Sequence, residues 1–280
     1  MKAAAFDYYR ADHAQDALRL LTEHGGAGKL MAGSQSLGPM LNLRLARPAH
    51  VIDISNCADL RRVTLLDRVI RVGACVTHAE IEDGVFEPLR GHPLQQVATR
   101  IAYRAVRNRG TIGGSLAHAD PAADWVLACM ALNANIEITS TKIVRKLPMH
   151  EFMLAAYTTA LEDDEMITAI EFPLISEQTR WGYYKFCRKT GEFAEASCAV
   201  LIDPVARVSR VIVGALDGPP ADLPVIAHHI ARNGLASVSF EDIVDALSTI
   251  APNKDLIDRK LYANAVRRSL ALALGAVESI

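Results

Sequence analysis

The chain has 280 residues, with 30 lysines and arginines against 32 aspartates and glutamates, so its formal net charge is −2. Hydrophobic residues make up 50% and charged residues 22%, a balance typical of a folded globular protein. The near-neutral charge argues against a nucleic-acid-binding protein, and no apolar run reaches the ~18–20 residues that cross a bilayer. The first residues contain no continuous apolar stretch, so we expect no secretory signal.

The five cysteines are scattered along the chain, and the two nearest ones, Cys187 and Cys198, are eleven positions apart. Iron–sulfur clusters and structural zinc sites need closely spaced Cys or His ligands, which this sequence lacks. An odd number of dispersed cysteines also argues against a disulfide framework. We therefore expect a cytoplasmic protein with neither a cluster nor a bound metal.

The first sixty residues predict a compact α/β unit. Apolar residues recur at helical spacing over 13–24, and Gly25 and Gly26 then end the helix. Short strands are predicted at 29–32 and 50–54. A helix over 40–46, opened by Pro39, is expected between them.

Residues 61 to 175 predict a second α/β unit. A hairpin is expected over 63–76, followed by a helix over 78–83 that Thr77 caps together with Glu80. Three more segments should follow: a helix from Pro93 to about residue 108, a glycine-rich turn at 110–115, and a helix over 122–132. Strands are predicted at 136–139 and 166–172.

The last third predicts three antiparallel strands and then three helices, an α+β layer with helices on one face of one sheet. The strands are expected at 181–188, 198–202 and 208–216, and the helices at 223–232, 240–249 and 261–276. We therefore divide the chain into a domain over 1–175, with subdomains 1–60 and 61–175, and a C-terminal domain over 176–280.

Two glycine-rich turns carry the strongest functional signal: Ala-Gly-Ser-Gln-Ser at 32–36 and Thr-Ile-Gly-Gly-Ser at 111–115. Glycine lets a ligand approach the backbone, and successive N–H groups before a helix can bind an anion. Two such turns facing each other would hold a diphosphate, although each alone could be an ordinary capped turn. Neither matches the Walker A motif or the Rossmann G-x-G-x-x-G. The sequence therefore suggests a dinucleotide bound without a Rossmann unit.

Four stretches resemble the flavoprotein subunits of molybdenum hydroxylases. AGSQSLGPMLNLRLARPAHVIDIS at 32–55 resembles their AGGxSL-P-M--RLA-P--LIDI signature, and RNRGTIGGSLAHADPAAD at 107–124 is similar to RN-GTIGGN-AHADPA-D. The stretch 72–82 resembles the segment that links these two. The stretch 184–200 resembles the K-x-x-R-x-x-D-(Y/F)-A element of the C-terminal domain. Together the stretches follow the family order along nearly the whole chain.

This resemblance implies an α+β protein with a PCMH-type, vanillyl-alcohol-oxidase-like FAD-binding fold. Such a fold has two α/β subdomains, followed by a C-terminal three-stranded antiparallel sheet with a helical bundle. The implied FAD-binding residues are Ala32, Gly33, Ser34, Gln35, Ser36 and Leu37 in the first turn, Gly110, Thr111, Ile112, Gly113, Gly114 and Ser115 in the second, and Asp124, Ile167 and Lys185 elsewhere. Ser34 replaces the usual second glycine and Ser115 the usual asparagine, which removes an amide donor and acceptor.

The three isolated residues each have an alternative reading. Asp124 matches an acid that contacts the flavin, but it could simply favour the N-terminal end of a helix. Ile167 matches an apolar flavin contact, or it could be an ordinary core residue. Lys185 matches a lysine near the flavin ring that stabilises the reduced form, or it could lie exposed on a strand. His118, Asp120 and Asp124 are too few ligands for a metal site.

By the same resemblance, the chain is the FAD-binding electron-transfer subunit of a heterotrimeric molybdenum hydroxylase. The large subunit would carry molybdopterin cytosine dinucleotide and the small subunit two [2Fe–2S] clusters, with two heterotrimers forming a dimer. One alternative is a stand-alone FAD-dependent oxidoreductase of the vanillyl-alcohol-oxidase-like superfamily. Another is a scaffold that has lost its flavin. No catalytic acid or base is predicted.

Overall fold

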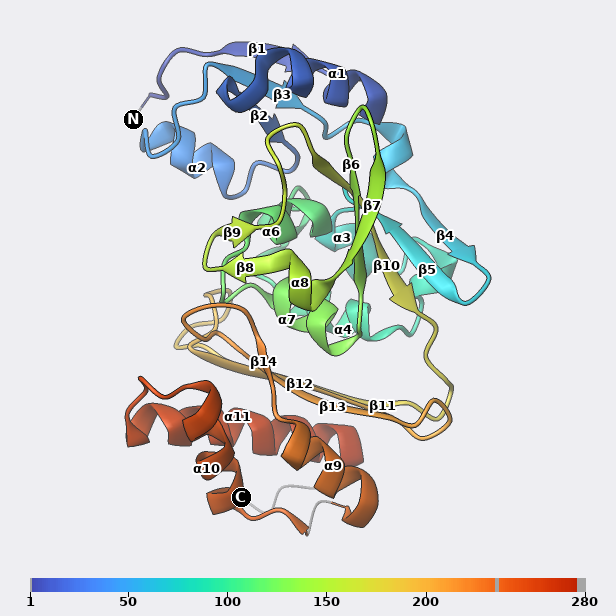
Figure 1. Ribbon diagram of the computed structural model, residues 1–280, viewed down its shortest axis with the longest axis vertical. Helices are drawn as coiled ribbons and strands as arrows, with labels where there is room; N and C mark the ends of the chain where they lie inside the picture. The colour runs from blue at the N-terminus through green and yellow to red at the C-terminus, as the bar shows by residue number, and fades with distance from the viewer. Residues whose placement is uncertain (1, 235–236, 276–280) are drawn as a thin grey trace. The chain divides into compact units, whose positions relative to one another are not determined.

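The computed structural model describes residues 2–234 and 237–275, and the chain forms two compact units (Figure 1). The first unit comprises Met1–Ala119 and Ala134–Pro173, and the second comprises Asp120–Asn133 and Leu174–Ile280. Residues 120–133 thus belong with the C-terminal part, although they precede residue 175 in the chain. The domain division at 175 stays a prediction.

A three-stranded parallel sheet forms the N-terminal layer of the first unit, in the order β1-β3-β2. Its strands are β1 (Asp7–Arg10), β2 (Gly28–Met31) and β3 (His50–Asp53). Helix α1 (Ala14–His24) has Ala17, Leu18 and Leu21 buried, which confirms the predicted amphipathic helix. Helix α2 (Leu37–Asn42) begins three residues earlier than predicted, because Pro39 lies inside its first turn rather than opening it.

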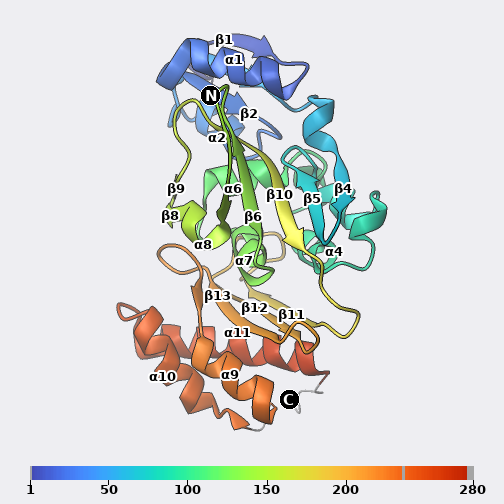
Figure 2. The same cartoon turned by 45° about the vertical axis from the view of Figure 1, so that its right-hand side comes forward.

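A five-stranded antiparallel sheet forms the rest of the first unit, with β10 at its centre between β5 and β6 (Figure 2). The strands, in sheet order, are β4 (Val63–Leu66), β5 (Val69–Gly73), β10 (Met166–Pro173), β6 (Asn135–Thr139) and β7 (Val144–Pro148). The β4–β5 pairing confirms the predicted hairpin. A two-stranded sheet, β8 (Met153–Ala155) with β9 (Thr158–Thr159), follows the short helix α8 (Met149–Phe152).

Short helices join these strands. Helix α3 (His78–Glu82) has the predicted capping box, in which Thr77 and Glu80 each accept from the other's backbone N–H. The single helix predicted from Pro93 to residue 108 is wrong. The chain forms α4 (Pro93–Thr99) and α5 (Arg104–Arg107), separated by Ala102 in a left-handed conformation at φ +40°. The second glycine turn continues directly into α6 (Ile112–His118).

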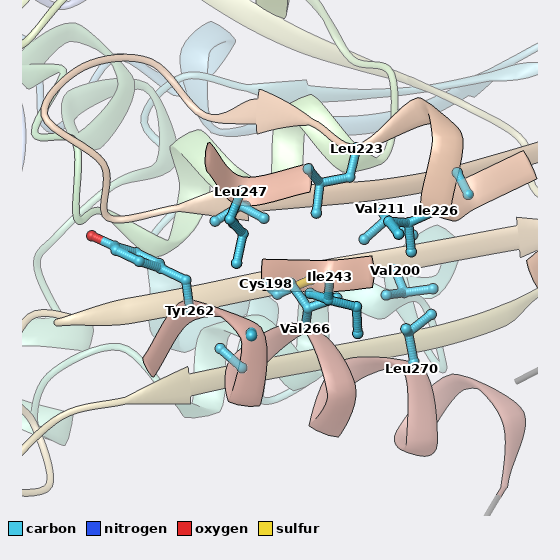
Figure 3. Packing of buried hydrophobic residues seen from close by; sticks show 14 of the residues in the cluster. Cys198, Val200, Val211, Leu223, Ile226, Ile243, Leu247, Tyr262, Val266 and Leu270 are labelled. Carbon is cyan, nitrogen blue, oxygen red and sulfur yellow. The ribbon is translucent and has the colours of Figure 1, made fainter. Parts of the chain in front are cut away.

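The second unit is a four-stranded antiparallel sheet with helices on both faces. Its strands, in sheet order, are β11 (Arg180–Phe186), β12 (Ala196–Asp203), β13 (Val208–Gly214) and β14 (Ala221–Asp222). Helices α9 (Pro224–Asn233), α10 (Phe240–Ile250) and α11 (Leu256–Leu274) bury a core that includes Cys198, Val200, Val211 and Val266 (Figure 3).

Helix α7 (Asp124–Ala131) lies against the other face of this sheet. Along β11, Tyr183 and Lys185 contact Asp124 of α7, whereas Tyr184 contacts Arg268 of α11. Because successive strand residues point to opposite faces, α7 and α11 must cover opposite sides. The expectation of helices on one face only is therefore wrong. The sheet also has one strand more than the three predicted, because the two-residue strand β14 pairs with Ile212 and Val213.

The last helix begins at Leu256, capped by Asp255, rather than at the predicted residue 261. The predicted end at residue 276 lies outside the described residues. Across the part of the chain that the structure describes, no helix is long and apolar enough to span a bilayer.

Candidate functional site

The two glycine turns lie against each other in the first unit. Gly33 is buried, and a Cβ at this position would lie 1.9 Å from the carbonyl oxygen of Arg109 and 2.8 Å from the Cα of Gly110. Only glycine fits such a contact without moving one of the backbones. The structure therefore brings together residues 32–37 and 110–115, although almost eighty residues separate them in the chain.

The first turn presents backbone donors that the protein does not use. Within the described residues, the N–H groups of Ser34, Gln35, Ser36 and Leu37 donate to no acceptor in the chain. The turn is held instead by Gly38 N–H, which donates to Ser34 O at 3.0 Å, and by Gln35 Nε2, which donates to Gly33 O at 3.0 Å. A row of free amides ahead of α2 is the arrangement that a phosphate oxygen can accept from.

Ser34 adopts a left-handed conformation at φ +60°. The family signature has glycine at this position, and the conformation explains that preference because a Cβ is disfavoured there. Ser34 has a short side chain and adopts this conformation, and its carbonyl oxygen still accepts from Gly38 N–H within the turn. Its departure from the signature therefore leaves the four free amides in place.

The second turn is built differently, because its amides are engaged within the chain. Ile112 N–H donates to Val76 O at 3.1 Å and Gly113 N–H donates to Ala74 O at 2.9 Å, which fixes the turn to the segment after β5. Gly114 N–H donates to the capping hydroxyl of Thr111 at 3.1 Å. The expectation that both turns offer free N–H groups thus holds for the first turn only.

Gly113 and Gly114 serve different purposes. A Cβ at Gly113 would lie 2.5 Å from the Cβ of Ala74, so this buried glycine allows close packing beneath the turn. Gly114 is exposed, and a Cβ there would lie 3.7 Å from the Cβ of Ala32 in the first turn. Gly114 is therefore the position at which a bound group could approach the backbone beside both turns.

A neutral histidine packs against the second turn. The backbone N–H of His78 donates to Gly110 O at 2.9 Å, and a Cβ at Gly110 would lie 2.7 Å from Nε2 of the His78 ring. Burial lowers the pKa of His78 to about 3, and the nearby charge of Arg107 acts in the same direction. The imidazole is therefore uncharged near neutral pH and acts as a packing surface.

Ile167 lies in β10, the central strand on which α6 packs. Its side chain is buried, and the β10–β6 register shifts between Ile167 and Ala169. Thr168 O at this bulge accepts from Ala74 N–H at 3.0 Å. Ile167 is thus a core residue beside the elements that support the second turn. Its proposed contact with a cofactor stays a prediction.

The structure joins Asp124 and Lys185 in a buried ion pair within the second unit. Lys185 Nζ lies 3.1 Å from Asp124 Oδ1 and 3.0 Å from Oδ2, and the two side chains are only 4% and 5% exposed. Tyr183, two residues earlier on β11, donates its hydroxyl to Asp124 Oδ1. The alternative of an exposed strand lysine is therefore wrong.

Burial raises the pKa of Asp124, while the charge of Lys185 and the hydrogen bonds from Tyr183 and Lys185 oppose that rise. The carboxylate thus depends on both partners, because an unpaired charge in this environment would be costly. The sequence analysis did not identify Tyr183. The available signal was its spacing from Lys185, since residues i and i+2 of a strand share a face.

The three residues considered for a metal site, His118, Asp120 and Asp124, each contact other groups in the structure. Asp120 Oδ1 accepts from Ala122 N–H at 2.9 Å, and the ring of His118 lies 5.3 Å from that of Tyr157. Among the described residues, no three or more His, Cys, Asp or Glu side chains form a group that could hold a metal ion.

Comparison with known proteins defines the class to which this site belongs. Residues 4–175 match the family described as the FAD binding domain in molybdopterin dehydrogenase, and the chain belongs to that family. The free amides of the first turn and the exposed Gly114 beside them fit the pyrophosphate of FAD. The identification made from the sequence motifs is confirmed.

Individual relatives narrow the class to the medium-subunit flavoproteins of molybdenum hydroxylases. The chain is 32% identical to the 6-hydroxypseudooxynicotine dehydrogenase complex subunit alpha of Paenarthrobacter nicotinovorans, over 98% of this chain and 96% of that protein. It is 36% identical to the carbon monoxide dehydrogenase medium chain of Hydrogenophaga pseudoflava, over 70% and 69%. The carbon monoxide dehydrogenase structure from that organism superposes with a TM-score of 0.89 at 28% identity, covering 99% of this chain and 100% of the matched one.

Proposed function

We propose that this chain is the electron-transferring flavoprotein subunit of a heterotrimeric molybdenum hydroxylase. It would receive electrons from two [2Fe–2S] clusters on a small subunit, while a large subunit with molybdopterin cytosine dinucleotide hydroxylates the substrate. FAD, when bound, supplies a redox centre that exchanges electrons singly or in pairs. Membership of the family and the medium-chain relatives support this assignment.

The observation that carries the proposal is the contact between the two turns. The amides of residues 34–37 would hold the pyrophosphate, and Gly114 would allow it to reach the backbone beside α6. Gly33 keeps the turns together, and the hydroxyl of Ser115 can donate to and accept from the bound group. These residues bind and orient. None of them is proposed as a catalytic acid or base.

Asp124, Ile167 and Lys185 remain proposed FAD-binding residues on the basis of the motif resemblance. The ion pair adds that Asp124 and Lys185 must act together, because removing either side chain leaves the other charged and buried. Tyr183 joins them as a positioning residue that holds the carboxylate.

Four further assignments belong to the same proposal. Residues 1–175 would form the PCMH-type domain, with subdomains 1–60 and 61–175, and residues 176–280 the C-terminal domain. Two heterotrimers would associate as a dimer. A cytoplasmic location agrees with the five cysteines, all of which are free thiols in the structure.

The visible spectrum of the purified chain tests this function. Flavin bands at about 450 nm, or their appearance after FAD is added, are expected. A colourless chain that cannot be loaded with FAD would contradict the assignment. Substrate turnover by the isolated chain would instead favour the stand-alone oxidoreductase. Reduction of its flavin only when the cluster-bearing subunit is present supports the electron-transfer role.

A further inference from the structure

Arg109 lies at the contact between the two glycine turns. Its carbonyl oxygen is the atom that a Cβ at Gly33 would meet at 1.9 Å, and it directly precedes Gly110 in the chain. The backbone here is fixed, because Arg109 N–H and Gly110 N–H donate to Val106 O at 3.1 Å and 2.8 Å. Ser34, the first of the four residues with free amides, follows Gly33 in the chain. Arg109 therefore packs against the residue that comes immediately before those donors.

The two turns contain no charged side chain. Residues 32–37 and 110–115 consist only of glycine, alanine, serine, threonine, glutamine, leucine and isoleucine. Their backbone N–H groups carry partial positive charge, whereas each phosphate group of a bound pyrophosphate carries a full negative charge. A full counter-charge can therefore come only from a residue outside the turns, and Arg109 is the basic residue directly next to the second one.

Two neighbouring arginines face the acidic end of α3, and Arg109 does not. Arg104 Nη1 and Arg107 Nε lie 2.8 Å and 2.7 Å from Glu82 Oε2. The hydrogen bond of the Arg109 N–H continues the helical turn, which places its side chain about 160° around that turn from Arg107. Arg109 is exposed, and its guanidinium has no ion pair or hydrogen bond within the part of the chain that the structure describes. Its charge is therefore not compensated by α3.

We propose that the guanidinium of Arg109 pairs with the pyrophosphate of FAD and supplies the counter-charge that the backbone amides lack. The inference rests on the proposed function, which assigns the pyrophosphate to the two turns. It goes beyond the family motif, because RN-GTIGGN leaves the position of Arg109 unspecified. A guanidinium suits this role because its planar fork can donate two parallel hydrogen bonds to phosphate oxygens. Arg109 binds and orients the cofactor and takes no part in proton transfer.

Titration of the full-length apoprotein with FAD tests this pairing. The Kd would be measured from the change in flavin fluorescence, at low and at high salt. Arg109→Gln should raise the Kd at least about fivefold at low salt, because a charge-assisted hydrogen bond to phosphate is lost. Arg109→Lys keeps the charge without the fork and should raise the Kd by less. Arg68→Gln is the matched control, since it removes an exposed arginine at the turn of the β4–β5 hairpin, and should stay within about twofold of wild type.

Two further readouts separate charge pairing from a structural role. The Kd of the wild-type chain should rise with salt more steeply than that of Arg109→Gln, because the variant has lost a charge that salt screens. Inorganic pyrophosphate should compete with FAD for the wild-type chain with a Ki at least about fivefold lower than for Arg109→Gln. The urea unfolding transition of the apoprotein should be the same in both. If Arg109→Gln is less stable, the Arg109→Lys variant decides, because a structural role for the charge would not distinguish the fork from the ammonium.

Unchanged FAD affinity in Arg109→Gln overturns the pairing. So does a loss of affinity that leaves the salt dependence and the Ki of pyrophosphate at their wild-type values, because the side chain would then act on another part of the cofactor. In either case a wild-type chain that binds FAD leaves the proposed function standing. A wild-type chain that does not bind FAD contradicts the proposed function itself.

Discussion

Replacing Lys185 by methionine should destabilise the second unit strongly, because it leaves the carboxylate of Asp124 buried without its cation. The two side chains are 4% and 5% exposed, so water cannot replace the lost partner. Breaking a buried pair of this kind costs about 3–5 kcal/mol. The hydrogen bond from Tyr183 remains and moderates the loss, so we expect about 3 kcal/mol for Lys185→Met.

The double variant Asp124→Asn with Lys185→Met is the matched control. It removes both charges at nearly constant volume, and should recover more than half of the lost stability because no unpaired charge remains. A cost for Lys185→Met below about 1 kcal/mol, or a double variant as unstable as the sum of the single ones, would refute the reasoning.

Tryptophan fluorescence measures this unit selectively. The chain has two tryptophans, Trp125 in α7 and Trp181 in β11, and both belong to the second unit. Urea unfolding of the apoprotein, followed by this signal, gives the change in the free energy of unfolding.

The pH dependence provides an independent check of sign. Burial raises the pKa of Asp124, and Lys185 opposes that rise, so removing Lys185 moves the pKa further upward. A carboxyl whose folded pKa lies above its unfolded value destabilises the fold above that pKa, and the penalty disappears as pH falls through it. The deficit of Lys185→Met should therefore shrink as the pH is lowered from neutral, and a deficit that grows on acidification would contradict the assignment.

Three further substitutions test the backbone conformation of Ser34 and the close packing at two glycines, Gly114 and Gly182. Gly114→Val should abolish FAD loading, since the side chain occupies the exposed approach beside Ala32 and also displaces the Thr111 hydroxyl, and full flavin absorbance in this variant would refute the pyrophosphate site. Ser34→Gly should leave the FAD content unchanged and raise the free energy of unfolding by at most about 1 kcal/mol. The gain is small because relief of the left-handed strain is partly offset by the backbone entropy of glycine. Loss of FAD from this variant would show that the serine itself is needed. Gly182→Ala should lower the free energy of unfolding, measured by tryptophan fluorescence, by at least about 2 kcal/mol, because its Cβ would lie 1.9 Å from Ser269 O of α11. Gly218→Ala is the control and should be nearly neutral, because a Cβ there would have no atom within 4 Å. Equal effects of the two substitutions would contradict the described α11–β11 contact.

The sequence predicted well those elements whose signals are local. The capping box of Thr77 and Glu80 and the β4–β5 hairpin are stabilised by residues a few positions apart, so the pattern alone defines them. The predicted helix from Pro93 to residue 108 failed for the converse reason. Its composition suits a helix, but the chain turns at Ala102, where Arg107 Nη1 donates to the carbonyl oxygens of Ile101 and Ala102, and no short-range motif marks that turn.

The sequence by itself determined the family and the two glycine turns, because motif identity and spacing are properties of the chain as written. Only the tertiary structure decided which of the two turns can bind an anion through its backbone. The N–H groups of the first turn are free, whereas those of the second turn donate to Ala74, Val76 and Thr111. The structure also paired Asp124 with Lys185 and Tyr183, some sixty residues away. Hydrogen-bond satisfaction and charge pairing depend on which groups meet in space, and sequence distance carries no information about such meetings.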